Sequence, residues 1–319
     1  MLDAVDFLLV NPWQRGFALE PRPFAPVARK AGIGEEEALA RLGRLQQQGV
    51  IDRIGPVFRP NTVGASSLAA IAVPPERLAE VAAFVSDRPG VNHNYEREHR
   101  YNLWFVGTGP DAAAVEASLD AIENGTGLRV LRLPLLEEFH IDLGFDLESR
   151  EAPRAAAPES FPPLSPEERR LVAATAAGLP LVAEPYAAVA QELGISEGEV
   201  LERLRTMLAD GRIRRIGAVV RHRRLGYQAN AMAVWDVPDE QVFALARRLS
   251  LSRAVTLCYR RARALPDWPY NLYCMVHGRL RNLVADEIAR LAAAHGLDAF
   301  PHAVLFSNRC FSQRPARYG

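Results

Sequence analysis

The chain has 319 residues, of which 49% are hydrophobic, and its 38 basic and 38 acidic side chains give a formal net charge of zero. No stretch approaches the roughly 18 uninterrupted apolar residues of a membrane span, and no basic-then-apolar signal opens the chain, so we expect a cytoplasmic globular protein without membrane partners. Three cysteines without CxxC spacing, Cys258, Cys274 and Cys310, suggest neither a disulfide framework nor a zinc or other metal site.

The zero net charge conceals an asymmetry between the two halves. Residues 1–150 carry 15 basic and 21 acidic side chains, whereas residues 151–319 carry 23 and 17. Either the halves attract each other, or the second half attracts an anion.

The first half is predicted to begin with three helices, at residues 3–10, 25–31 and 35–48. Apolar residues recur at helical spacing in the third of these helices, and Gly49 ends it. A strand follows, and helix, helix, turn, helix, strand is the order of a winged helix-turn-helix. The rest of the half alternates as strand 67–73, helix 76–87, two strands, helix 111–124 and strand 129–136. That βαββαβ order predicts a ferredoxin-like sandwich with the helices on one face of the sheet.

Residues 150–166 hold five prolines and four alanines, a composition typical of a semi-rigid linker. The second half then repeats the first. Its predicted helices are 166–177, 186–193, 196–210, 240–249 and 280–295, and its predicted outer strands are 229–237 and 298–305.

The repeat is also visible in the residues themselves. GVIDRIGPVFRPNTVG (49–64) returns as GRIRRIGAVVRHRRLG (211–226), and YNLWFVGTG (101–109) returns as YNLYCMVHG (270–278). Each copy is large enough to bury its own core, so the chain is a fused pair of homologous halves.

These observations predict an α+β fold in which duplicated winged helix-turn-helix and ferredoxin-like domains form an intramolecular pseudo-dimer. The predicted domains are a winged helix-turn-helix at 1–60, a ferredoxin-like domain at 61–149, the linker at 150–166, a second winged helix-turn-helix at 167–222, and a second ferredoxin-like domain at 223–319. The sequence does not indicate whether the pseudo-dimer assembles into a larger oligomer.

This order of elements resembles the AsnC/Lrp family of amino-acid-responsive transcription regulators. The local motifs VNHNYEREHRYNLWFVGTG (91–109) and YRRARALPDWPYNLYCMVHG (259–278) look more specifically like the first and second subunit types of siroheme decarboxylase, an AsnC-like heterodimer, here fused in one chain. The resemblance implies a carboxy-lyase that needs no organic cofactor. It would remove the C12 and C18 acetate carboxyls of siroheme to give 12,18-didecarboxysiroheme, in heme d1 or alternative heme biosynthesis. The alternative is a ligand-responsive transcription regulator.

The helix that a regulator would place in DNA is mixed in charge. It opens with Glu35, Glu36 and Glu37 in the first half, and carboxylates there repel phosphate. Arg41 and Arg44 follow. These charges disfavour DNA as a partner, and we expect the helix-turn-helix to be a structural, dimer-forming module.

A substrate with several carboxylates needs fixed cations in its pocket. Six arginines lie within residues 212–224, and among them Arg215 and Arg221 are the better candidates for binding carboxylates. A solvated wing is the alternative for each of them. Arg59 and Arg97 are the candidates from the first half.

Alternation along strand 91–98 places Val91, His93, Tyr95 and Arg97 on one face. We propose His93 as the proton donor, because an imidazole titrates near neutrality, with Tyr95 and Arg97 positioning carboxylates. A lone histidine on a strand is more often structural, but this row and the resemblance favour a catalytic one. The matching row in the second half is Val255, Leu257, Tyr259 and Arg261, so a histidine stands at this position once per chain.

Four further residues complete the candidate site. His222, inside the arginine cluster, is a second candidate for catalysis or for binding a propionate. The alternative is that it is a residue of the wing with no role in the site. His277 ends a strand where the first half has Thr108, and it would approach the iron, serve the second acetate or make a core hydrogen bond. Trp268, in an insertion at 262–269, would line the pocket by stacking or pack its own loop. Asn271 repeats Asn102, which favours a structural hydrogen bond over chemistry.

Overall fold

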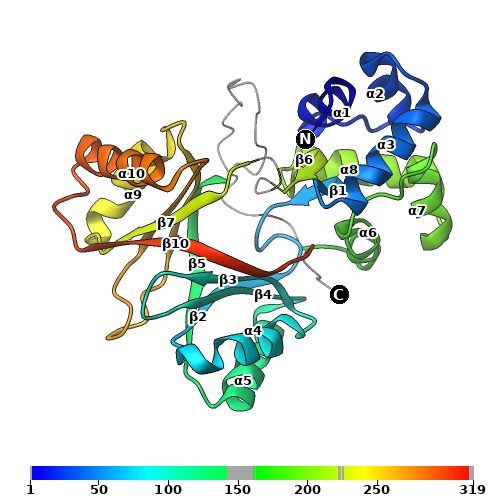
Figure 1. The fold of residues 1–319 in the computed structure, drawn as a ribbon. Helices are drawn as coiled ribbons and strands as arrows, with labels where there is room; N and C mark the ends of the chain where they lie inside the picture. Colours follow the sequence, from blue (N-terminus) through cyan, green and yellow to red (C-terminus); the bar gives the residue numbers. More distant parts are fainter. Residues whose placement is uncertain (1, 142–160, 162, 222–223, 225, 316–319) are drawn as a thin grey trace. The chain divides into compact units, whose positions relative to one another are not determined.

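The computed structural model describes residues 2–141, 161, 163–221, 224 and 226–315. The chain forms two compact units, and each takes its elements from both halves of the sequence (Figure 1). Unit 1 comprises Met1–Gly64, Gly144–Leu225 and Pro315–Gly319; unit 2 comprises Ala65–Leu143 and Gly226–Arg314. Most of the predicted linker lies outside the described residues. The predicted domain boundaries stay a prediction, because the units group domains by kind rather than by half.

Unit 1 contains the helices of both helix-turn-helix segments around one apolar core. Glycine in the left-handed conformation ends two of the helices, at Gly32 (φ 73°) and Gly194 (φ 70°). Ser165 and Ser196 begin two others, each through a capping box with a glutamate three residues on. The helices are α1 (Ala4–Val10), the 3₁₀ helix η1 (Asn11–Gln14), α2 (Phe24–Ala31), α3 (Glu35–Gln47), α6 (Pro166–Ala176), α7 (Pro185–Leu193) and α8 (Glu197–Ala209).

The strand after each set of helices pairs with its counterpart from the other half. β1 (Ile51–Phe58) and β6 (Ile213–Val220) form an antiparallel two-stranded sheet in which Gly55 lies opposite Gly217. A Cβ on Gly217 would lie 2.3 Å from the carbonyl oxygen of Trp13, so this position requires glycine. The central glycines of the two repeats, Gly55 and Gly217, therefore lie opposite each other where β1 pairs with β6.

Unit 2 holds both ferredoxin-like segments, and their strands close into one barrel in the order β10-β3-β4-β2-β5-β8-β9-β7. The predicted α+β class and duplicated pseudo-dimer are confirmed. The first half supplies β2 (Ala65–Ile71), η2 (Pro75–Arg77), α4 (Leu78–Ser86), β3 (Val91–Arg97), β4 (Leu103–Gly109), α5 (Ala112–Thr126) and β5 (Val130–Ile141). The second supplies β7 (Ala229–Trp235), α9 (Asp239–Ser250), β8 (Val255–Arg261), β9 (Leu272–Gly278), α10 (Arg281–His295) and β10 (His302–Gln313).

The last strand of each half is longer than predicted. β5 pairs with β2 of its own half through Pro134 and then with β8 of the other half as far as Ile141, and β10 pairs in the same way with β7 and then β3. The predicted ends, at 136 and 305, were wrong because the pattern of one half contains no sign of pairing partners in the other. The two exchanged strands close the barrel.

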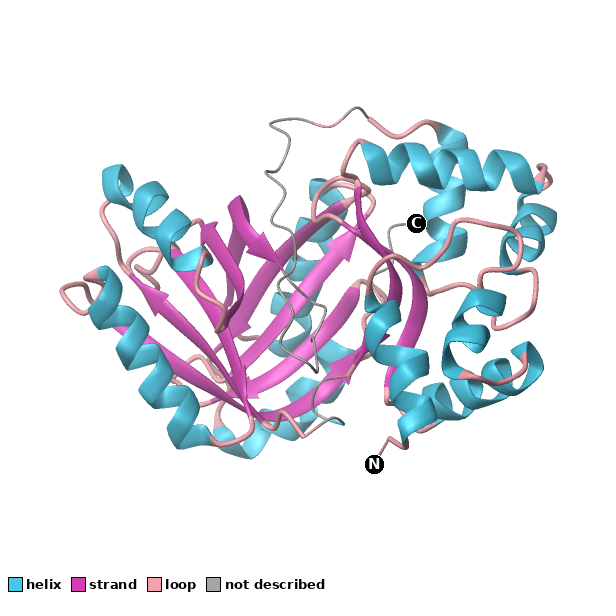
Figure 2. Cartoon of the chain, turned by 90° about the horizontal axis from the view of Figure 1, so that it is seen from above, coloured by secondary structure: helices cyan, strands magenta, loops and turns pink. Residues whose placement is uncertain are grey.

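Helices cover the outside of the barrel, as predicted for a sandwich with its helices on one face (Figures 1 and 2). One apolar core lies between the first-half strands and α4 and α5, and a second between the second-half strands and α9 and α10. A third lies inside the barrel and takes residues from both halves, among them Trp104, Leu133, Trp268 and Tyr273. Among the described residues, no helix has the length and apolar composition to cross a membrane.

A β-bulge near the start of β3 and of β8 changes the predicted faces. Val91 pairs with Gly107 and His93 with Val106, so Asn92 is the extra residue; Thr256 is its counterpart in β8. The prediction that Val91 and Val255 share a face with His93 and Leu257 was therefore wrong, because both valines pack in the cores beneath the helices.

Replacing Leu133 with alanine tests the interior of the barrel. Leu133 is 0% exposed whereas Leu136, on the same strand, is 57% exposed. We expect Leu133→Ala to lower the free energy of unfolding by about 2–5 kcal/mol, because it leaves a cavity, and Leu136→Ala to change it by about 0.5 kcal/mol or less. Urea unfolding of the two variants measures the difference, and equal effects would contradict the assignment of Leu133 to the interior core.

Candidate active site

His93, Tyr95 and Arg97 face the interior of the barrel. Between them, Asn94 is 0% exposed and donates from Nδ2 to the carbonyl oxygen of Ala82 and to Ser86 Oγ, both at 3.0 Å, on α4. Because side chains alternate along a strand, its neighbours point to the opposite face. The rings of His93 and Tyr95 are nearly parallel, with centroids 6.3 Å apart, so the two side chains line one wall of the barrel.

Tyr95 also contacts the exchanged strand. Its hydroxyl lies 3.3 Å from Gln313 Oε1, and Gln313 itself lies opposite His93 in the register of β10 against β3. The surroundings of His93 are thus built by both halves of the chain. Gln313 carries no sequence signal of this role, because the pairing of β10 with β3 is not visible in the sequence.

Arg97 and Arg261 form a pseudo-symmetric pair. Arg97 donates to the carbonyl oxygen of Leu305 on β10 at 3.1 Å, and Arg261 donates to that of Leu133 on β5 at 2.9 Å. Each guanidinium therefore binds a strand that comes from the other half. Arg97 is 8% exposed, and burial lowers the pKa of Arg261 without removing its charge at neutral pH. The barrel interior holds two fixed positive charges.

A tyrosine lies beside each of these arginines. The guanidinium carbon of Arg261 is 5.0 Å from the centre of the Tyr259 ring, and that of Arg97 is 5.9 Å from the centre of the Tyr95 ring. The predicted row of the second half, Leu257, Tyr259 and Arg261, repeats the first-half row in position and differs by the absence of an imidazole.

His277 lies on β9, two residues beyond Met275, which belongs to the interior cluster of the barrel. Alternation places the imidazole on the same interior side. Its Nδ1 is 2.8 Å from the hydroxyl oxygen of Thr256, the extra residue of the β8 bulge. Sequence reasoning found His277 and missed Thr256, because a strict two-residue period contains no bulge.

Trp268 is 0% exposed and lies in an aromatic cluster inside the barrel. Its indole nitrogen donates to the Tyr273 hydroxyl at 2.6 Å. Neighbouring rings meet it edge to face, with the centroid of Trp104 at 5.0 Å and that of Tyr270 at 4.9 Å. The insertion that carries Trp268 thus fills the barrel interior beside Arg261, whose guanidinium also lies 6.0 Å from the Tyr273 ring.

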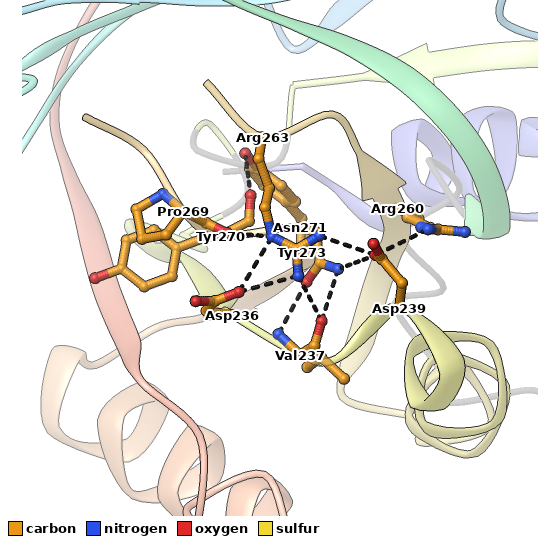
Figure 3. A network of polar contacts seen from close by, with 9 residues as sticks. All are labelled: Asp236, Val237, Asp239, Arg260, Arg263, Pro269, Tyr270, Asn271 and Tyr273. Atoms are coloured by element: carbon orange, nitrogen blue, oxygen red, sulfur yellow. Dashed lines mark hydrogen bonds and ion pairs between the residues drawn. The ribbon is translucent and has the colours of Figure 1, made fainter. Parts of the chain in front are cut away.

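Asn271 is held by the backbone (Figure 3). Its Oδ1 accepts from the N–H of Val237 at 3.0 Å and its Nδ2 donates to the carbonyl oxygen of Val237 at 2.9 Å. Asn102 makes the same two bonds with Val73. Arg263 fastens the same loop by binding Asp236 and Asp239. The side chain of Asn271 is therefore engaged in fixing the start of β9.

The other predicted residues belong to unit 1. Arg215 donates to the carbonyl oxygens of Ala218, at 3.1 Å, and Gln14. Arg221 forms an ion pair with Asp52 at 2.8 Å, and Arg59 donates to the carbonyl oxygen of Gly211 at 3.1 Å. His222 lies outside the described residues. These arginines are bound by protein groups, and the structure does not place them in the compact unit that contains His93.

The basic residues of the third helix are also engaged. Arg41 lies 2.9 Å from Asp3 and 3.1 Å from Asp6, and Arg44 lies 3.2 Å from Asp6. These carboxylates compete with any phosphate for the same guanidinium groups. The arrangement leaves α3 poorly suited to DNA.

Metal-binding groups and a cavity elsewhere in the structure bear on the choice of site. In the part of the chain that the structure describes, no group of three or more His, Cys, Asp and Glu side chains is arranged to hold a metal ion. A cavity of about 520 Å³ in unit 1 is lined by Leu179, Leu181 and Glu192 among others, and by none of the predicted residues. The interior of the barrel, with its imidazoles and guanidinium groups, is therefore the better candidate for chemistry.

The chain is similar to known proteins over both of its units. A family model described as an AsnC-like ligand binding domain matches residues 63–140 and 224–312, and a siroheme decarboxylase NirDL-like HTH domain matches residues 6–51 and 168–214. The siroheme decarboxylase NirDL subunit of Paracoccus denitrificans (strain Pd 1222) is 47% identical over 320 residues, covering 99% of this chain and 97% of that protein. The chain belongs to the siroheme decarboxylase family.

Solved structures of the siroheme decarboxylase NirDL are similar over nearly the whole chain. A crystal structure of that protein matches with a TM-score of 0.71 and 30% identity, covering 99% of this chain and 94% of that chain. Another, in co-complex with an iron-uroporphyrin III analogue, matches with a TM-score of 0.69 and 30% identity, covering 98% and 94%. The resemblance to siroheme decarboxylases seen in the sequence motifs is confirmed.

His99, at the edge of the aromatic cluster, provides a test of pH dependence. Burial, together with the charge of Arg100, lowers the pKa of His99 below its usual 6.5, and its Nδ1 accepts from the N–H of Tyr101 at 3.0 Å. The unfolded chain binds this proton more readily, so we expect the free energy of unfolding to decrease as the pH falls below about 6.5. Urea unfolding at neutral and mildly acidic pH measures this loss. His99→Gln should reduce it, and an identical loss in the variant would exclude His99 as its source.

Proposed function

We propose that the chain removes the acetate carboxyls at C12 and C18 of siroheme, giving 12,18-didecarboxysiroheme, and that it does so inside the barrel of unit 2. The observation that carries the proposal is the row of His93, Tyr95 and Arg97 on an interior wall, with Arg261 as the pseudo-symmetric counterpart of Arg97. Membership in the siroheme decarboxylase family supports the choice of substrate.

The chemistry requires an electron sink and a proton. When the bond between the acetate carbon and its carboxyl group breaks, carbon dioxide leaves and the electron pair stays on the side-chain carbon. A macrocycle that takes up a proton from water beside the acetate accepts that pair, and it releases the same proton once the side chain is a methyl group. The methylene left by the loss of carbon dioxide becomes that methyl group by taking up a second proton. His93 supplies this proton, because an imidazole both donates and recovers a proton near neutral pH. No organic cofactor takes part in these steps.

The buried guanidinium groups bind the carboxylates that do not react. Moving a carboxylate out of water is costly unless a cation and hydrogen-bond donors receive it. Arg97 and Arg261 supply two such cations, each held in position by a backbone carbonyl oxygen. Tyr95 and Tyr259 stand beside them and donate to the same groups of the substrate.

The other candidate residues are assigned differently. Arg59, Arg215 and Arg221 stay predictions of carboxylate binding, because they belong to unit 1. His222 stays a prediction that lies outside the described residues. Trp268 contributes to the wall of the barrel interior. We do not assign Asn271 to the substrate, since both ends of its amide bind Val237. The alternative of a transcription regulator gains no support from α3, whose Arg41 and Arg44 bind carboxylates.

Anaerobic incubation with siroheme tests the proposal. We expect mass spectrometry of the tetrapyrrole to show two successive losses of carbon dioxide, ending at 12,18-didecarboxysiroheme. Recovery of unchanged siroheme after incubation with folded protein would refute the proposed function. A gel shift with genomic fragments should show no specific complex, and tight specific binding would support the regulator instead.

His93→Gln tests the assignment of the proton donor. Loss of a general acid typically slows a reaction by about 100- to 10,000-fold, so we expect a decrease of that size in the decarboxylation rate, with siroheme binding retained. His302→Gln is the matched control, because His302 is exposed and lies 3.0 Å from the carbonyl oxygen of Phe300. If His93→Gln turned over both acetates as fast as His302→Gln, His93 would not be the acid.

A further inference from the structure

The insertion at residues 262–269 lies at one end of the barrel. β4, β2 and β5 separate β3 from β8, and every neighbouring pair is antiparallel, so β3 and β8 run in the same direction. The turns that follow these two strands therefore lie at the same end. After β3 the turn is residues 98–102, and after β8 it is the longer segment 262–271, which contains the insertion. The two halves are unequal at this end of the barrel.

The insertion is fastened to its own half at two places. The backbones of Ala264 and Trp268 exchange two hydrogen bonds of 2.9 Å, so the loop closes on itself. Arg263 pairs with Asp236 and donates to the carbonyl oxygen of Pro269 at 2.8 Å (Figure 3). Because these contacts hold both ends of the loop, they also hold the backbone that carries the indole of Trp268.

The insertion also binds the other half of the chain. The N–H of Ala262 donates to the carbonyl oxygen of Pro134 on β5 at 3.1 Å. Asp267 forms an ion pair with Arg129, which directly precedes β5. The loop of the second half is therefore held against the strand that ends the first half.

Trp268 adds an indole to this end of the barrel, and the matching turn of the first half, residues 98–102, contains no tryptophan. The side chain is 0% exposed, and its Nε1 donates to the Tyr273 hydroxyl at 2.6 Å. Rings of the first half surround it, with centroids at 5.0 Å for Trp104, 5.2 Å for His99 and 6.0 Å for Tyr101. The indole thus lies where the two halves meet and fills space that the repeat alone would leave to either half.

A barrel with exact two-fold symmetry would bind an asymmetric ligand equally well in two orientations. The repeat relates β3 to β8 and β4 to β9, and a half turn about the barrel axis exchanges these strands. A tetrapyrrole turned in this way would find Arg261 in place of Arg97, each bound to a backbone carbonyl oxygen. A fixed indole that belongs to one half removes the equivalence, because in a close-packed interior a shape that fits one orientation leaves a clash or a gap in the other.

We propose that Trp268 is a specificity-determining residue, which closes one end of the barrel and admits siroheme in a single orientation. This inference rests on the proposed function. The acetate that this orientation places beside His93 loses its carboxyl group first. Without the indole the tetrapyrrole binds in both orientations, and either acetate reacts first.

The orientation can be measured without turnover. A paramagnetic iron tetrapyrrole that binds in two orientations gives two sets of shifted proton signals in NMR. With iron-uroporphyrin III as the probe, we expect one set in the wild type and a second set in Trp268→Ala. Trp268→Leu, which keeps an apolar side chain in the core, repeats the test if Trp268→Ala does not fold. Leu265→Ala is the matched control with one set, because Leu265 belongs to the same insertion and is 65% exposed. Two sets in the wild type, or one set in both folded Trp268 variants, would overturn the proposal.

The first product tests the same claim during turnover. When the reaction with siroheme is stopped after the first loss of carbon dioxide, the wild type and Leu265→Ala should give one monodecarboxylated isomer, at C12 or at C18, in excess. We expect Trp268→Ala to lower the ratio of the two isomers about 10-fold, the discrimination that pocket shape typically provides. An unchanged ratio in folded Trp268→Ala and Trp268→Leu would overturn the proposal. Absence of any decarboxylation by the wild type would refute the proposed function instead, and the NMR measurement would still decide the orientation.

Discussion

The last strand of each half, β5 or β10, extends to pair with a strand of the other half. The rest of unit 2 depends on this exchange of strands. β5 and β10 each pair first with a strand of their own half and then with a strand of the other, and these contacts close eight strands into a barrel. Arg97 and Arg261 bind carbonyl oxygens on the exchanged strands. Without the exchange neither guanidinium would have its partner, and the interior would be an open sheet face.

The closed barrel repeats the same strands in its two halves, but some of the side chains on matching strands differ between the halves. The arginines, their tyrosines and the bulges occur in both halves, whereas His93 corresponds to Leu257 and His277 corresponds to Thr108. The two halves therefore differ in where an imidazole stands along their matching strands. The two halves share their strands and helices because one sequence was duplicated. They differ at matching positions such as His93 and Leu257, or His277 and Thr108.

The sequence allowed most of the secondary structure to be predicted, because helical periodicity, capping residues and the internal repeat are local signals. The row of His93, Tyr95 and Arg97 was also predictable, since it follows from alternation beyond the bulge. Three features were not: the extension of β5 and β10, the bulges that move Val91 and Val255 to the helix side, and the contact of Thr256 with His277. All three depend on which strands pair and in what register, which one strand's own residues do not specify.

The central claim is that the tetrapyrrole lies inside the barrel of unit 2, among side chains from both halves. A crystal structure of this chain with an unreactive iron tetrapyrrole tests it most directly. The account predicts the macrocycle in the interior, with an acetate beside His93 and carboxylates on Arg97 and Arg261. A macrocycle bound outside the barrel, with these three side chains in their ligand-free contacts, would contradict it.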